Sequence, residues 1–195
     1  MNVISLPLLT FLIVFPLGGA ILCGASRRSD TLCRWIALLS CGATLALAIL
    51  LYRTPGQGGW LLRNDYPWIE SLGIRFTLGM DGVSLLMVLL TALLIMVAVL
   101  VSWPTVREKV ALYFSLLLIL EGGLMGVFLA LDLFLFYVFW EVMLIPAIFL
   151  IIIWGGEGSW RAVFKFVFFT LCGSLLMLLS IISLYYLHGE QTGIF

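Results

Sequence analysis

The sequence has 195 residues, of which 64% are hydrophobic and only 10% are charged. Its mean hydropathy of +1.23 excludes a soluble globular domain and indicates an integral membrane protein in contact with the lipid bilayer. Ten basic side chains balance ten acidic ones, so the chain lacks the basic surplus typical of nucleic-acid-binding proteins. No nucleic acid is therefore expected as a partner.

Hydropathy divides the chain into about six spans, each near the ~20 residues that a hydrocarbon core of ~30 Å requires. No Lys or Arg precedes the first span, so we expect it to stay as a membrane anchor rather than to be cleaved as a signal peptide. The predicted fold class is all-α, a polytopic membrane protein with a single transmembrane domain over residues 1–195. The predicted spans are residues 3–23, 32–52, 81–103, 112–131, 132–154 and 162–187.

Basic side chains predict the orientation of the spans, because short cytoplasmic loops carry an excess of Lys and Arg. Three of the ten basic residues, Arg53, Arg63 and Arg75, fall on one side of the alternation. Both termini and the long segment 53–80 are therefore predicted to be external. In that segment we expect turns at 55–59, and an interfacial stretch that contains Trp60 and Trp68. The seven residues on the cytoplasmic side are Arg27, Arg28, Arg34, Arg107, Lys109, Arg161 and Lys165.

Cysteine and histidine give no pattern of a metal site. The cysteines lie in apolar stretches with no CxxC pair, and we expect them to be small buried side chains. The single histidine, His188, stands beside Gly189 and Glu190 at the end of an apolar run, where we expect an interfacial position. No cofactor or metal is expected on this chain, so redox chemistry would belong to other chains. The four cysteines are Cys23, Cys33, Cys41 and Cys172.

Two aspartates stand where predicted helices begin. Asp132 follows "VFLAL" at the sharp reversal between the fourth and fifth spans, and Asp81 opens the third span in "LGMDGVSLL". A carboxylate at such a position accepts hydrogen bonds from the free N–H groups of the first turn and suits the positive end of the helix dipole. Both residues are therefore predicted to be N-caps.

Glu141 is the main candidate for function. It lies inside the apolar stretch "FYVFWEVMLIPAIFLIIIWGG" (136–156), about nine residues after Asp132, which places it roughly 14 Å into the membrane. An ionisable side chain near the bilayer centre costs roughly 2.5–3.5 kcal/mol and is by default functional, in a proton relay or an ion pathway. Pro146 follows five residues later and cannot donate a helix hydrogen bond to the Val142 carbonyl, which offers water a foothold beside Glu141.

Two further charged residues are weaker candidates. Glu121 in "LLILEGGLMGVF" lies about as far before the reversal as Glu141 lies after it. If the two carboxyls face each other, they would titrate as a coupled pair; the adjacent Gly122-Gly123 instead suits close helix packing. Lys165 enters the sixth span only about 6 Å from its cytoplasmic end. It is expected to snorkel to the interface, or to feed or gate a cytoplasmic half-channel.

Three stretches carry a resemblance to a known family: "LGMDGVSLLMVLLTALL", "GVFLALDLFLFYVFWEVMLIPAIFLIIIWGG" and "KFVFFT". Together they resemble the antiporter-like membrane subunits of respiratory complex I, most closely the bacterial M-type subunits of NADH:quinone oxidoreductase. The resemblance implies an antiporter-like fold of about fourteen helices, with Glu141 as a central element of the proton pathway. Because the chain ends after the sixth span, it is expected to be the N-terminal part of such a subunit, as a fragment, a split gene product or a frameshifted product.

The resemblance also implies cofactors and partners. NADH, FMN, iron–sulfur clusters and quinone would belong to partner subunits, and the neighbours would be antiporter-like and quinone-module chains in a bacterial inner membrane. The favoured function is a proton-translocating, non-redox subunit of NADH:quinone oxidoreductase. A subunit of a multisubunit cation/proton antiporter or of a membrane-bound hydrogenase is the related alternative. A structural or assembly membrane protein with a vestigial Glu141 is the alternative of another class.

Overall fold

The computed structural model of the chain describes residues 8–26, 29–53, 61–69 and 73–192. Six helices in these residues are long and apolar enough to cross a membrane, which agrees with the six predicted spans. Each helix agrees with its predicted span to within a few residues wherever the structure describes the ends. The helices are α1 (Leu8–Ala25), α2 (Asp30–Tyr52), α3 (Gly82–Thr105), α4 (Val110–Leu129), α5 (Leu133–Trp154) and α6 (Ser159–Thr192).

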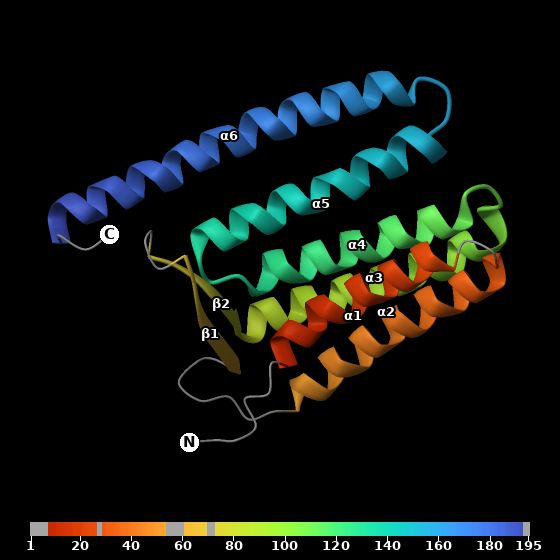
Figure 1. Cartoon of the computed structure of the whole chain (residues 1–195), viewed down its shortest axis with the longest axis horizontal. Helices are drawn as coiled ribbons and strands as arrows, with labels where there is room; N and C mark the ends of the chain where they lie inside the picture. Colours follow the sequence, from red (N-terminus) through yellow and green to blue (C-terminus); the bar gives the residue numbers. More distant parts are fainter. Residues whose placement is uncertain (1–7, 27–28, 54–60, 70–72, 193–195) are drawn as a thin grey trace.

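Helices α1 to α4 form a bundle, α5 packs on α4, and α6 packs on α5 at the edge of the molecule (Figure 1). In the most apolar 18-residue stretch of each helix, 67% of the residues of α4 are buried but only 6% of those of α6. Helix α4 is therefore central and α6 peripheral. Glycines allow the close packing around α4. A Cβ atom on Gly122 would lie 2.9 Å from the side chain of Leu17 on α1, and a Cβ atom on Gly126 would overlap the ring of Phe139 on α5.

Both predicted N-caps are confirmed. The Asp81 carboxylate accepts a hydrogen bond from the Ser84 backbone N–H at 2.7 Å. The Ser84 hydroxyl oxygen in turn accepts a hydrogen bond from the Asp81 backbone N–H, which completes a capping box. One oxygen of Asp132 accepts from the backbone N–H groups of Phe134 and Leu135, at 2.9 and 3.0 Å. Helix α5 therefore begins directly after the short connection that follows α4.

A β-hairpin occupies most of the described part of the predicted external segment. Strand β1 (Leu62–Ile69) pairs antiparallel with β2 (Ile74–Met80), with Leu62 opposite Met80. The hairpin continues onto the α4–α5 connection, because the Leu131 backbone N–H donates to the Thr77 carbonyl at 2.9 Å. The sequence prediction had turns and an interfacial stretch here, and it missed the strands; Trp60 and residues 55–59 lie outside the described residues.

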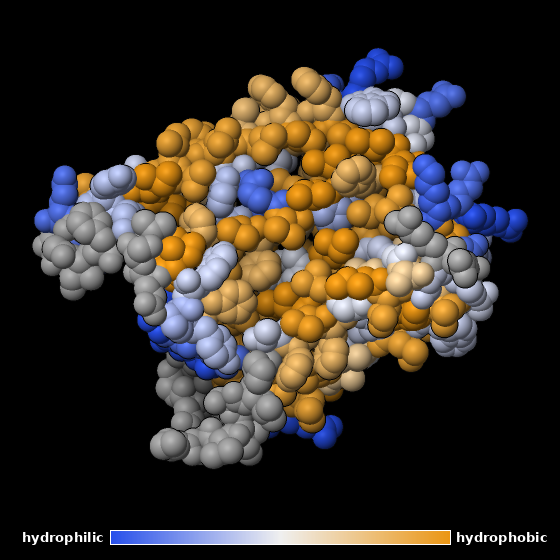
Figure 2. Space-filling model, in the orientation of Figure 1, coloured by the Kyte–Doolittle hydropathy of each residue, from blue (hydrophilic) through white to orange (hydrophobic). Residues whose placement is uncertain are grey.

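On the face shown in Figure 2, apolar residues cover most of the middle of the molecule, and hydrophilic residues gather mainly toward its two ends. The start of α1, the end of α6 and the hairpin lie at one end of the bundle, as an even number of spans requires (Figure 1). Aromatic side chains mark the opposite end, where Trp35 packs edge-on against Trp103 and Trp154 Nε1 donates to the Glu108 carbonyl at 3.2 Å. This distribution is that of an integral membrane protein with an aromatic belt. The outward orientation of the termini stays a prediction.

Candidate functional site

Glu141 lies within α5, eight residues after Leu133, or about 12 Å along the helix axis from its first residue. The side chain is partly buried, and its Oε1 atom is buried without a hydrogen-bond partner among the described residues. Helix α5 continues through Pro146, which removes one donor N–H a turn further on. A carboxyl oxygen that lacks a partner in an apolar span is the kind of group that takes up a proton or binds water.

One tyrosine hydroxyl lies near this carboxyl. Tyr137 precedes Glu141 by one helical turn on the same face of α5, and its hydroxyl interacts with both the Glu141 carboxyl and the Ser174 hydroxyl. Ser174 is 4% exposed and lies on α6, where its Oγ also donates to the Leu171 carbonyl at 3.1 Å. The sequence reasoning missed both residues. The four-residue spacing could have identified Tyr137, whereas Ser174 required the register of α6 against α5.

A pocket of about 340 Å³ lies next to this cluster, between α5 and α6. Ser174 and Thr170 contribute hydroxyl groups to its wall, and Trp140, the neighbour of Glu141 in the chain, closes one side. The polar edge of the pocket therefore begins at the residue that contacts Tyr137. Its lining residues are Trp140, Phe169, Thr170, Gly173, Ser174 and Met177.

Glu121 is fully buried, but it does not face Glu141. Its Oε2 atom accepts a hydrogen bond from Cys41 Sγ of α2 at 3.2 Å, and its Oε1 atom is unpartnered among the described residues. Helix α5 packs instead on Gly123 and Gly126, which lie about 200° and 140° around the α4 axis from Glu121. The coupled pair was expected only if the two carboxyls faced each other, and in the structure the Glu121 carboxyl contacts Cys41 of α2 instead.

Lys165 also lies apart from Glu141. Its side chain is exposed on α6, while its neighbours Val163 and Val167 turn toward α5. Position 165 is nine residues before Ser174, or about 14 Å along the helix. The structure thus places no cation of α6 against the Glu141 carboxyl within the part of the chain that it describes.

The cysteines and the histidine belong to no cluster of possible metal ligands among the described residues. Across the described residues, no three His, Cys, Asp or Glu side chains lie close enough to hold an ion. Cys23, Cys33 and Cys41 are buried as predicted, but Cys172 is exposed, because it lies on the face of α6 that turns away from α5. His188 is exposed near the end of α6 and lines a pocket together with Asp132.

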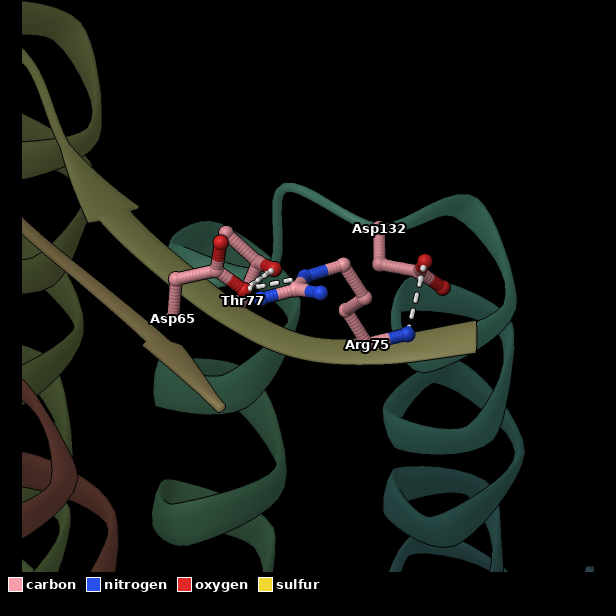
Figure 3. Close-up of polar contacts among 4 residues, drawn as sticks. All are labelled: Asp65, Arg75, Thr77 and Asp132. Atoms are coloured by element: carbon pink, nitrogen blue, oxygen red, sulfur yellow. Dashed lines mark hydrogen bonds and ion pairs between the residues drawn. The ribbon is translucent and has the colours of Figure 1, made fainter. Parts of the chain in front are cut away.

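A polar cluster lies at the N-terminal end of α5 (Figure 3). Arg75 Nε forms an ion pair with the Asp65 carboxylate at 2.7 Å, and the Thr77 hydroxyl donates to the same oxygen at 2.8 Å. These two donors hold the pKa of Asp65 below its usual range. The backbone N–H of Arg75 donates to the second oxygen of Asp132 at 3.4 Å, so β2 contacts the residue that caps α5.

Comparison with known sequences identifies close relatives. A family model described as "NADH:quinone oxidoreductase/Mrp antiporter, TM" matches residues 130–194, which include all of α5 and α6. NADH-quinone oxidoreductase subunit M of Pseudomonas aeruginosa is 42% identical over 96% of this chain and 40% of its own length. The subunit M of Escherichia coli K12 is 41% identical over the same shares. The chain thus spans about 40% of the length of these curated relatives.

Solved structures show the same arrangement of helices. A chain of respiratory complex I from Thermus thermophilus with bound NADH is 33% identical and superposes with a TM-score of 0.80, over 93% of this chain and 36% of that one. A chain of the Mrp complex from Dietzia matches with a TM-score of 0.76 at 20% identity, which shows a shared fold alone. These sequence and structural matches agree: over nearly its whole length the chain is similar to antiporter-like membrane subunits of NADH:quinone oxidoreductases, and it shares their fold.

Proposed function

We propose that this chain is a proton-translocating, non-redox membrane subunit of a NADH:quinone oxidoreductase, with Glu141 as its proton-binding site. The observation that carries the proposal is the position of Glu141 inside α5, with one buried carboxyl oxygen that lacks a partner among the described residues. The relatives that are 41–42% identical are named as M subunits of this enzyme, which supports the choice of complex.

In this proposal Glu141 binds and releases a proton as the charges around it change. A carboxylate at this depth costs roughly 2.5–3.5 kcal/mol on insertion scales, so a permanently charged Glu141 would destabilise the inserted protein. Tyr137 supplies a hydroxyl group beside the carboxyl, and the apolar side chains of α5 keep bulk water away. The chain's own task is to hold one exchangeable proton within the bilayer.

Electron transfer would take place on partner chains. We propose that NADH, FMN, iron–sulfur clusters and quinone are bound by other subunits of the complex, and that this chain contacts further antiporter-like and quinone-module chains. The exposed apolar face of α6 is consistent with such neighbours or with lipid. The M subunits of Pseudomonas aeruginosa and Escherichia coli make a bacterial inner membrane the proposed location.

A cation/proton antiporter subunit is the second candidate. The description of the matching family model includes Mrp antiporters, and the Mrp complex from Dietzia shares the fold. The two candidates differ in their partners rather than in the chemistry of Glu141. Neighbouring genes for flavin and iron–sulfur subunits would favour the oxidoreductase, and neighbouring genes for small antiporter subunits would favour the antiporter.

The test is Glu141→Gln in the assembled complex, measured as NADH-driven proton uptake by inverted membrane vesicles. Gln keeps the size and hydrogen bonding of Glu but cannot ionise, so we expect proton uptake to fall by about 10-fold or more. Glu141→Asp should be milder. Electron transfer from NADH to artificial acceptors should stay intact, because the cofactors would lie on other chains.

Glu157→Gln provides the matched control. Glu157 is exposed in the connection between α5 and α6, so its neutralisation removes the same charge outside the membrane span. Normal proton uptake in the Glu141→Gln variant, at normal assembly, would leave the structural or assembly protein as the better assignment.

A further inference from the structure

Glu121 and Cys41 form a polar contact in the interior of the bundle of α1 to α4. Cys41 belongs to the buried face of α2, whose neighbouring members Ala37, Thr44 and Ala48 are also small. These small side chains leave room for Glu121 to reach from α4 toward α2. Its Oε2 atom accepts a hydrogen bond from Cys41 Sγ at 3.2 Å, and both residues are fully buried. The helices around the carboxyl therefore close it off from water.

This carboxyl has few hydrogen-bond donors. Its Oε1 atom is buried without a partner among the described residues. Two buried hydroxyls, on α2 and on α4 itself, donate elsewhere: Thr44 to the Ser40 carbonyl at 3.0 Å, and Ser115 to the Ala20 carbonyl at 3.0 Å. A single thiol, which is a weak donor, is thus the hydrogen-bond partner of Glu121 in the described part of the chain.

No cation balances the carboxyl within the described residues. Helices α1, α3 and α5, which pack on α4, contain no Lys or Arg. On α2, Arg34 Nη2 donates to the Val106 carbonyl at 2.9 Å, and Arg75 on β2 is paired within the hairpin. Lys109 stands twelve residues, or about 18 Å, before the carboxyl on α4. The other ionisable side chains on these elements are Cys23, Asp30, Cys33, Tyr52, Tyr113, Tyr137 and Glu141.

These surroundings favour a neutral Glu121. A buried carboxylate with one weak donor and no counter-ion is far more costly than the neutral acid, because the ion gives up much more hydration. We propose that Glu121 stays protonated, and that its contact with Cys41 is a neutral hydrogen bond that joins α4 to α2. In this state Oε2 is the carbonyl oxygen that accepts the thiol proton, and Oε1 carries the carboxyl proton.

The proposal makes Glu121 a site that holds a proton without exchanging it. The described spans contain two acidic residues away from the helix ends, Glu121 and Glu141. If Glu121 stays neutral, Glu141 is the one of the two whose charge can change. The inference concerns a site apart from Glu141, and it stands whether or not Glu141 binds the translocated proton.

The test is infrared spectroscopy of the assembled complex in lipid at about pH 6 and about pH 8. The C=O stretching band of protonated Glu121, assigned by its loss in Glu121→Gln, should have the same intensity at both values, although an exposed glutamate is ionised at both. Cys41→Ala removes the donor to Oε2, so the band should move to higher frequency. Cys41→Ser replaces the thiol by a stronger donor, so the band should move to lower frequency.

Cys33→Ala and Cys33→Ser are the matched controls. Cys33 is also fully buried on α2, but it lies eight residues, or about 12 Å, before Cys41. Neither control should move the band. A band that disappears between the two pH values would show that Glu121 ionises and would overturn the proposal. A band that moves equally in the Cys33 and Cys41 variants, or in none of them, would refute the thiol contact.

The measurement does not depend on a single variant. If Glu121→Gln fails to assemble, the band is assigned by its opposite shifts in Cys41→Ala and Cys41→Ser, and the absence of any such band contradicts the proposal. The spectra need no proton pumping. A failure of the neutral Glu121 is therefore distinguishable from a failure of the proposed function, which the pumping of Glu141→Gln decides.

Discussion

Glu121 and Glu141 lie in consecutive helices, yet they occupy opposite kinds of environment. Glu121 is fully buried in the bundle of α1 to α4, where its contact is the Cys41 thiol of α2. Glu141 is only partly buried, at the looser contact of α5 with α6, where the Tyr137 hydroxyl and a pocket lie nearby. A buried carboxyl exchanges protons with its surroundings only if polar groups or water reach it. The comparison favours Glu141 as the exchanging site and Glu121 as an enclosed one.

The largest expected difference is in proton pumping. We expect Glu141→Gln to abolish most NADH-driven proton uptake, whereas Glu121→Gln should keep most of it and leave its pH profile unchanged. The reason is that Glu121 faces α2 rather than α5, so the loss of its ionisable group removes no charge beside Glu141. Proton uptake in inverted vesicles across a range of pH measures both variants. A shift of the pH profile in Glu121→Gln would restore the coupled pair predicted from the sequence.

An intermediate effect is expected from the packing contact between α4 and α5, which involves a face of α4 other than the one that carries Glu121. A Cβ atom on Gly126 of α4 would overlap the Phe139 ring of α5, so Gly126→Ala should force α5 away from α4. Overpacking of this kind typically costs about 1–3 kcal/mol. Thermal unfolding of the assembled complex in lipid should therefore shift to lower temperature.

The matched control for that variant is Gly18→Ala on α1. A Cβ atom at Gly18 meets nothing within 4 Å, and Ala is the better helix former, so this change should be neutral or slightly stabilising. If Gly126→Ala unfolds at the same temperature as Gly18→Ala, then α5 is not held against α4 through this glycine. The geometric separation of Glu121 from Glu141 would then lose its physical basis.

The sequence allowed prediction of those features that depend on one helix at a time. Hydropathy located six spans, and the caps Asp81 and Asp132 followed from their places before apolar runs. Facing residues could not be predicted in the same way. The direction of Glu121 depends on which side of α4 carries the glycines that α5 packs against, and the Tyr137–Ser174 contact depends on the register between two helices.

The hairpin was missed although its sequence carries a signal. The stretch Ile74-Arg75-Phe76-Thr77-Leu78 alternates apolar and polar residues, which is the pattern of a half-buried strand. The turn residues at 55–59 led instead to the prediction of an irregular loop. The alternation has a structural purpose, because Thr77 and Arg75 project to Asp65 while the backbone of β2 contacts the start of α5.

The smallest expected effect concerns the cluster of Asp65, Arg75 and Thr77, which contacts the residue that caps α5. Asp65→Asn removes the ion pair with Arg75, so the thermal midpoint at neutral pH should fall slightly. The folded pKa of Asp65 is lowered by Arg75 and Thr77, so its contribution is present above its ordinary pKa of about 3.9 and is lost as the pH falls through the folded value. The difference between parent and variant should therefore shrink on acidification from pH 5 to about pH 3.

Glu108→Gln, an exposed change at the opposite end of the bundle, controls for general charge effects and should show no such pH dependence. A midpoint difference for Asp65→Asn that stays constant over this pH range would mean that the hairpin is held by its backbone hydrogen bonds to the α4–α5 connection, and not by the Asp65 charge.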